Sequence, residues 1–178
     1  IDLASQLTEV QNVVDTVFGG MAGEINEFAK NAVESFGISE LTAKKATSTF
    51  GAMYKSMGIG GEQMKEMAKG ITALAADMTS FYDVPINEML VKLRAGIAGE
   101  IEPLRQLGIN MTIANLEAYA MSQGIHKSYQ NMSQAEQAML RYNYLLSVTS
   151  DAQGDFARTS GSWANQVRIL GEQWNAFK

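Results

Sequence analysis

The sequence of 178 residues has no cysteine and only one histidine. The lack of cysteine excludes a disulfide framework, a thiolate metal site and a cysteine nucleophile. A single histidine excludes a zinc site with two histidine ligands. This residue, His126, follows a glycine turn and has no obvious carboxylate or hydroxyl partner in the sequence. A position in a surface loop is therefore favoured over a role as general base.

Excess basic charge and long apolar runs are also lacking. The 14 basic and 19 acidic residues give a net charge of −5, so we expect no direct nucleic-acid binding. No run approaches the roughly 18 apolar residues of a transmembrane segment, and the first ten residues lack the pattern of a signal peptide. The chain begins without methionine and ends inside an apolar pattern, so we interpret it as a piece of a longer protein.

A helical period is present along nearly the whole chain. The first stripe recurs at alternating steps of three and four residues and predicts an extended amphipathic helix over 1–38, through Leu3, Leu7, Val10, Val14, Val17, Met21, Ile25, Phe28, Ala32 and Phe36. Gly19 and Gly20 lie inside it, and a break there is the alternative. Gly37 is a natural stop, and Ser39 a natural restart.

Residues 39–178 form the second predicted unit, a helical module. The capping candidates are Ser39, Thr112 or Asn110, and the capping box Ser133 with Glu136. With the glycines and the two prolines, Pro85 and Pro103, they place the helices at about 39–57, 62–82, 86–98, 103–107, 112–123, 133–149 and 161–178. No period-two alternation is long enough for a strand. The predicted fold class is therefore all-α, with amphipathic helices that fold back at glycine and proline corners. A compact bundle and a string of extended helices both remain open.

Two predicted helices carry heptad seams, which suggest coiled-coil self-association. The first seam consists of Met64, Met67, Ile71, Leu74, Met78 and Phe81. Glu62, Lys65, Glu66 and Lys69 fall on the other faces of that helix. The second seam consists of Trp163, Val167, Leu170, Trp174 and Phe177.

The stretch "LRAGIAGEIEPLRQLGI", residues 93–109, is the main candidate for a structural corner or an interaction site. Its glycines allow the helix to end and the backbone to approach a neighbour, and proline restarts the helix. Its acids lie near that restart, where the positive helix end favours them, and its arginines are available to pair with them. We predict a corner with a charge lock, made by Arg94, Gly96, Gly99, Glu100, Glu102, Pro103, Arg105 and Gly108.

Enzymatic interpretations of these residues are weaker. Glu100 and Glu102 could pair as in a glycosidase, but their spacing between Gly99 and Pro103 favours a corner. Ser160 and Ser162 lack the strand and the base that a serine nucleophile needs. The "GIGG" run lacks the lysine and the strand of a phosphate-binding loop. We predict no catalytic, cofactor-binding or metal-binding residue, and a membrane-active role is disfavoured by the mean hydropathy of −0.09.

Several landmarks occur in an order that resembles the tape measure proteins of long-tailed bacteriophages and prophages. The resemblance covers roughly residues 40–178, and the 93–109 stretch is its most specific part. The other landmarks are the pairs Asp77 with Phe81, Tyr142 with Leu145, Gly154 with Asp155, and Ser162 with Asn165.

The resemblance implies a structural role. Tape measure proteins are long helical chains that occupy the tail tube during assembly, set its length and leave when the genome is ejected. The implied partners are the tail tube protein, tail assembly chaperones and tail-tip proteins. The implied location is the lumen of the virion tail, after assembly in the bacterial cytoplasm. Because residues 39–178 are expected to fold back, we expect the ruler function to belong mainly to longer flanking helices.

Overall fold

The computed structural model describes residues 2–159, and every regular element in that range is a helix. The prediction of an all-α fold is confirmed. In chain order the elements are α1 (Leu3–Phe18), the 3-10 turn η1 (Gly19–Met21), α2 (Ala22–Lys30), α3 (Ala32–Phe36), α4 (Glu40–Ser56), α5 (Gly61–Tyr82), α6 (Ile86–Ile97), α7 (Glu102–Arg105), α8 (Ile113–Ser122), the 3-10 turn η2 (Tyr129–Asn131), α9 (Gln134–Val148) and α10 (Asp155–Thr159).

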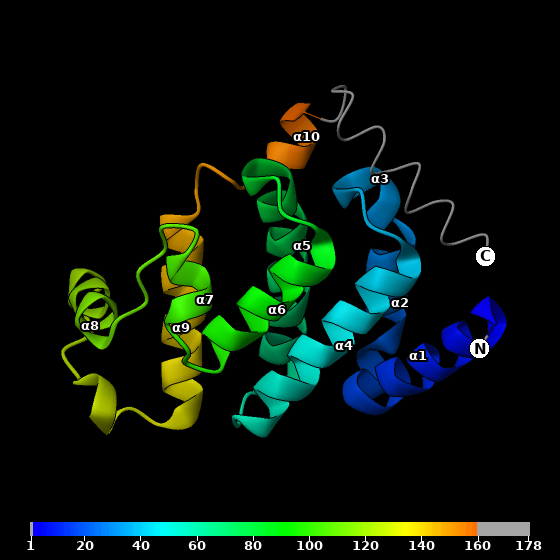
Figure 1. Cartoon of the computed structure of the whole chain (residues 1–178). Helices are drawn as coiled ribbons and strands as arrows, with labels where there is room; N and C mark the ends of the chain where they lie inside the picture. The colour runs from blue at the N-terminus through cyan, green and yellow to red at the C-terminus, as the bar shows by residue number, and fades with distance from the viewer. Residues whose placement is uncertain (1, 160–178) are drawn as a thin grey trace.

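Helix α5 lies in the middle of the molecule, with α9 and α8 on one side and α4, α2 and α1 on the other (Figure 1). α5 packs against α4, which packs in turn against α1 and α2, while α6 contacts both α5 and α9. The larger hydrophobic core extends through these helices, from Val14 and Phe18 in α1 to Leu140 and Leu145 in α9. One core therefore joins the first helix to the ninth.

Side-chain caps begin several helices at the residues that the sequence predicted. Ser39 Oγ accepts a hydrogen bond of 3.1 Å from the N–H of Thr42, and Thr112 caps α8. Ser133 and Glu136 form the predicted capping box of α9. Each cap of this kind stabilises a helix by about 1 kcal/mol. The bounds of α4 to α9 agree with the predicted ranges to within two residues.

Helix α1 ends at Phe18, so the expectation of one extended helix over 1–38 is wrong. Gly19 has a φ of 55°, and the turn at η1 lets α2 pack back against α1 while both contact α4. Gly51 of α4 permits this packing, because a Cβ there would lie 2.7 Å from Cζ of Phe18. The chain therefore breaks at Gly19, although the apolar stripe is continuous, because the break lets both α1 and α2 bury apolar side chains against α4. Val14, Phe18, Ala22 and Ile25 belong to the larger core, and Ala29, Ala32 and Ile38 pack with Ala43 and Ala76 in a smaller one, so the predicted division at residue 38 is not observed.

The seam predicted in α5 is buried within this chain and not available for self-association. Its first five members are at most 5% exposed, and they pack into the core shared with α4, α6 and α9: Met64, Met67, Ile71, Leu74 and Met78. The last member, Phe81, is 45% exposed. An apolar stripe indicates that one face of a helix is buried, and here that face is buried by other helices of the same chain. The second predicted seam, Trp163 to Phe177, lies outside the described residues, as does the predicted helix 161–178.

A short helix, α10, lies between the predicted helices 133–149 and 161–178, where the sequence predicted no helix. It packs against α5 and α3. Its first backbone N–H groups bond to a side chain 77 or more residues away, a contact that local sequence does not reveal.

No helix within residues 2–159 combines the length and the apolarity needed to cross a lipid bilayer.

Candidate functional site

The corner between α6 and α7 is built around close contact of backbone with side chains. A Cβ added to Gly96 would overlap Cδ1 of Leu104 and would lie 3.6 Å from Sδ of Met111. Leu104 and Met111 are buried, so they have little room to move away. Gly96 therefore lets the helix approach its neighbours closely, as predicted. Gly99 has a φ of 98°, which favours glycine where α6 has ended.

Two glycine turns close the backbone of this corner. The N–H of Glu100 donates to the carbonyl of Ala95 at 2.9 Å, after Gly99 has turned the chain. The N–H of Ile109 donates to the carbonyl of Leu104 at 3.1 Å, after Gly108 with its φ of 82°. Pro103 lies in the first turn of α7, where its missing N–H costs nothing. The predicted stop and restart are therefore present.

The charge lock differs from the predicted one. Glu102 and Arg105 form an ion pair within α7, but both side chains are substantially exposed, at 72% and 49%. Such pairs contribute about 0 to 1 kcal/mol. Glu100 is exposed, and Arg94 lines a groove on another face of α6. Of the two arginines available to pair with these acids, Arg105 forms an ion pair and Arg94 lies on the side of α6 that faces α1 and α4.

The residue that fastens the corner is Arg141 of α9. Its Nε donates to the carbonyl of Ile97, the last residue of α6, at 3.0 Å. Its Nη1 donates to the hydroxyl of Tyr129. Arg141 is only 6% exposed. Since the carbonyl end of a helix carries partial negative charge, Arg141 caps α6 from across the molecule.

Sequence analysis missed Arg141, although a signal for it exists. Arg141 follows Ala138 by three residues and precedes Leu145 by four, and both neighbours are 1% exposed. A charged residue in the middle of an apolar helix stripe is a candidate for a buried function. Tyr129 is also held in place, since its N–H donates to Glu117 at 3.0 Å and its carbonyl accepts from Gln137 at 2.8 Å.

A second device, which we call the Asp77 clasp, joins α5 to the start of α10. Asp77 accepts hydrogen bonds from the N–H of Gly154 at 2.8 Å and of Phe156 at 3.4 Å. Ser80 donates to Asp155 at 2.6 Å. Burial raises the pKa of Asp77, and the two backbone hydrogen bonds act in the opposite direction. Two of the landmarks behind the resemblance, Asp77 and the Gly154–Asp155 pair, therefore meet in space.

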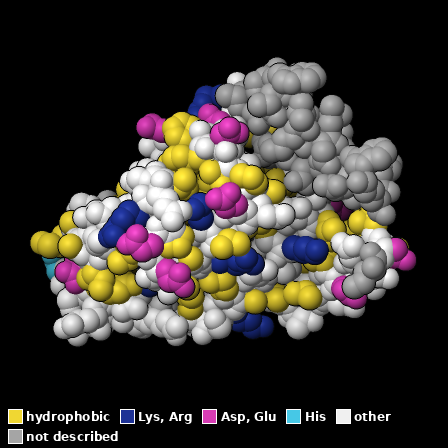
Figure 2. Space-filling model, in the orientation of Figure 1, with side chains coloured by type: hydrophobic (Ala, Val, Ile, Leu, Met, Phe, Trp, Pro, Cys, Tyr) yellow, Lys and Arg dark blue, Asp and Glu magenta, His cyan; other side chains and the backbone are white. Residues whose placement is uncertain are grey.

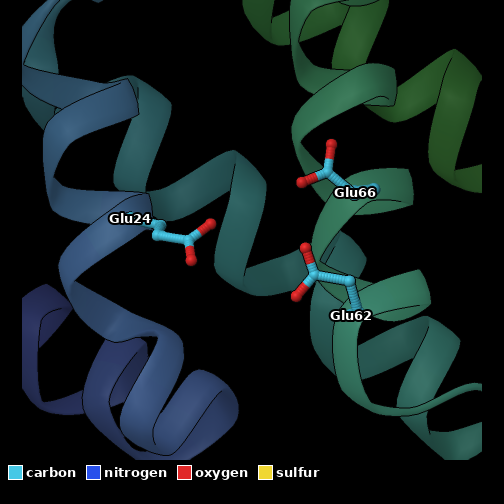
Figure 3. A group of neighbouring side chains, drawn as sticks. All are labelled: Glu24, Glu62 and Glu66. Carbon is cyan, nitrogen blue, oxygen red and sulfur yellow. The ribbon is translucent and has the colours of Figure 1, made fainter.

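Three acids gather between α2 and α5, where Figure 3 shows Glu24 facing Glu62 and Glu66. Lys65, which lies on another face of α5 than the apolar seam, is only 1% exposed. Its Nζ forms ion pairs with Glu24, with Glu62 at 2.6 Å and with Glu66 at 3.5 Å. The hydrogen bond with Glu24 raises the pKa of Lys65 and lowers that of Glu24. The ammonium group already supplies the positive charge that a metal ion would bring, so this cluster is a link between helices.

A groove of about 540 Å³ lies between α1, α4 and α6. Buried Val10 and Phe50 line it, together with Val13 and Val91, which are 47% and 54% exposed. The hydroxyl of Ser48, a further lining residue, is buried with no hydrogen-bond partner. The charged lining residues are Glu9, Lys45 and Arg94. An apolar floor with charged edges is typical of surfaces that receive an amphipathic helix.

The residues considered for catalysis do not converge in the described part of the chain. His126, Glu100 and Glu102 are all exposed. The "GIGG" run forms the turn between α4 and α5, and Ser160 and Ser162 lie outside the described residues. Acidic, basic and hydrophobic side chains are mixed on the face shown in Figure 2, which carries no field of one sign.

Comparison with known proteins identifies no relative of this chain. A scan against models of protein families, a search of curated proteins and a search of solved structures each found no match to this chain.

Proposed function

We propose that this chain is a folded segment of the tape measure protein of a long-tailed bacteriophage or prophage. The observation that carries the proposal is the meeting of its landmarks. The 93–109 stretch forms a fastened corner, and Asp77 holds the Gly154–Asp155 pair. The landmarks behind the resemblance are thus residues that hold this fold together, which supports the proposal. The role is structural and located in the tail lumen, after assembly in the host cytoplasm.

The folded arrangement bears on how such a segment would act in a tail. As one extended helix, residues 2–159 would span about 240 Å at 1.5 Å per residue. A compact chain of this size is about 40 Å across. In its folded form the segment contributes little length, so the ruler lies in flanking helices. The segment then serves assembly or ejection through the tail tube, tail-tip and chaperone proteins.

The test is an in-frame deletion of residues 2–159 from the parent protein, with tail length measured by electron microscopy. We expect no tails, or non-infectious particles whose tails change in length by no more than about 40 Å. Shortening by about 240 Å would mean that the segment acts as extended ruler. Normal, infectious particles would contradict a role in tail assembly. Duplication of the same residues is the matched control, since an extended ruler would then lengthen tails by the same amount.

We also propose that the segment is not an enzyme. Glu100 and Glu102 are exposed, and Glu102 is paired with Arg105, which does not suit a general acid held in a cleft. The purified chain should release no product from peptidoglycan. Release that disappears in both Glu100→Gln and Glu102→Gln would overturn this part of the proposal.

The groove between α1, α4 and α6 favours a second role, as a docking surface for a helix of a tail assembly chaperone. Its exposed valines fit an apolar stripe, and Lys45 and Arg94 at its edge fit a helix with acidic flanks. Val13→Glu with Val91→Glu should weaken binding of the purified chaperone at least tenfold. Val148→Glu, an equally exposed valine in α9, is the control and should leave binding unchanged. Equal effects of both changes would exclude the groove.

A further inference from the structure

Arg141 is a buried cation without an acidic partner in the part of the chain that the structure describes. Within residues 2–159 its guanidinium forms no ion pair, although it is only 6% exposed. Its recorded acceptors are a carbonyl and a phenol, both neutral. An arginine keeps its charge at any physiological pH, and a buried charge is costly unless it is compensated. The carbonyl end of α6 supplies about half a negative charge, so part of the cost remains.

The guanidinium faces a cavity of about 100 Å³ inside the corner. Gly96, Gly99, Ile101, Met111, Ile113, Leu116, Tyr129 and Arg141 line it. A cavity of this size holds several water molecules or one small oxyanion. Ile113 at its edge is 53% exposed, which places the cavity next to solvent.

Three features of the lining suit a negatively charged oxygen group. Arg141 can donate two parallel hydrogen bonds to a carboxylate or phosphate, which a lysine cannot do in the same geometry. Tyr129 accepts from Nη1 and so keeps its own hydroxyl proton for another acceptor. Helix α8 begins at Ile113 in the lining, and the start of a helix carries partial positive charge.

The acids nearest in sequence are engaged elsewhere or point to solvent. Glu117 accepts from the N–H of Tyr129, and Glu102 pairs with Arg105. Glu100 is exposed and directly follows Gly99, where a Cβ would lie 4.0 Å from Nη1 of Arg141. Glu100 is not among the residues that line the cavity, and its proximity to Gly99 makes it the acid of the corner to test as a competitor for the guanidinium.

We propose that the Arg141 cavity binds a small oxyanion of carboxylate or phosphate type, either an external one or the side chain of Glu100. Binding at this position fastens α6 to α9 by neutralising the charge between them. The state of the corner then depends on whether the anion is present. This site is independent of the tape measure proposal, because it rests only on the corner, η2, α8 and α9.

The test is a titration of the isotope-labelled 178-residue chain with acetate and with inorganic phosphate at constant ionic strength. Nuclear magnetic resonance reports the Nε–H of Arg141 and the N–H of Gly99. We expect a saturable shift of both signals, with half-saturation below about 10 mM for at least one probe. Arg105→Gln should retain the shift, and Arg141→Gln should abolish it at Gly99.

Glu100→Gln distinguishes the two sources of the anion. If Glu100 occupies the cavity, its removal should strengthen binding of the probe by about tenfold or more, because an intramolecular competitor is lost. If the anion concentration at half-saturation is the same in Glu100→Gln as in the wild type, the anion that occupies the cavity is external. Glu102→Gln is the control and should behave as the wild type.

Two results would overturn the proposal. One is a saturable shift that persists in Arg141→Gln. The other is the lack of any saturable shift in both the wild type and Glu100→Gln. The second result would overturn the proposal even if Arg141→Gln does not fold, because the wild type and Glu100→Gln both retain Arg141.

Discussion

Lys65 and Arg141 are both buried cations, and their surroundings differ in kind. Lys65 lies between three carboxylates from α2 and α5, so its charge is more than neutralised. Arg141 has a carbonyl, a phenol and a cavity. The comparison teaches that burial of a charge does not by itself mark a functional site. The compensated charge of Lys65 joins two helices, whereas the charge of Arg141 next to a cavity is the one that we propose binds an anion.

The largest expected effect follows from Arg141→Met. The change leaves the Ile97 carbonyl and the Tyr129 hydroxyl without their donor, and each loss costs about 1 to 3 kcal/mol. We expect the free energy of unfolding to fall by about 2 to 6 kcal/mol in urea titrations. Arg105→Met, which breaks an exposed pair, should change it by no more than about 0.5 kcal/mol. Equal losses would mean that Arg141 does not fasten the corner.

Gly96→Ala tests whether close packing holds the corner in which Arg141 acts. The new methyl group would overlap buried Leu104, and overpacking of this kind costs about 1 to 3 kcal/mol. Gly23→Ala in α2 is the matched control, since a Cβ there meets nothing within 4 Å. It should stabilise the protein by up to about 1 kcal/mol, because alanine favours helix. Thermal unfolding of both variants should therefore shift in opposite directions.

Lys65→Met separates the two cations by their response to salt. It leaves three carboxylates facing one another, and all three are exposed to solvent. We expect destabilisation at low ionic strength that largely disappears at about 1 M sodium chloride, where exposed charges are screened. The loss caused by Arg141→Met should persist in the same salt, because it comes from buried groups. A salt-independent Lys65→Met effect would contradict this distinction.

The smallest effect concerns pH. Hydrogen bonding to Ser133 and Lys127 lowers the pKa of Glu136 from 4.5 to about 2 in the folded protein. Its contribution to stability is therefore present above pH 4.5 and is lost as the pH falls towards 2. Between pH 4.5 and 2, the free energy of unfolding measured in urea should fall less steeply in Glu136→Gln than in the wild type. For Asp77 the sign is opposite, since its pKa is raised and its contribution is lost as the pH rises through the folded value.

Local signals in the sequence predicted most of the fold. Ser39, Thr112 and Ser133 act on their own helix, so their caps could be placed without knowing the tertiary structure. The stripe of α5 correctly marked a covered face, but the period of a helix does not say which surface covers it. The same limit applies to the first 38 residues, where packing on α4 decides between a straight helix and a break at Gly19.

The backbone of the candidate site could be predicted from the sequence, but its long-range partners could not. The 93–109 corner was visible in its glycines and proline, because these residues act on the local backbone. Its partner, Arg141, lies 44 residues from Ile97, and Asp77 lies 77 residues from Gly154. A single sequence does not contain such pairings, although a charged residue inside an apolar stripe is a signal for one.

A cysteine pair tests most directly the proposal that this chain is a tail segment that stays folded inside the assembled tail. The hydroxyl oxygens of Thr47 and Thr72 lie 3.3 Å apart between α4 and α5, and the chain has no other cysteine to interfere. In one extended helix the two positions would be about 38 Å apart. We predict that Thr47→Cys with Thr72→Cys forms a disulfide on oxidation of purified tails, seen as a faster band on non-reducing gels, whereas either single change does not. A disulfide that forms in the isolated chain but not in tails would contradict the account.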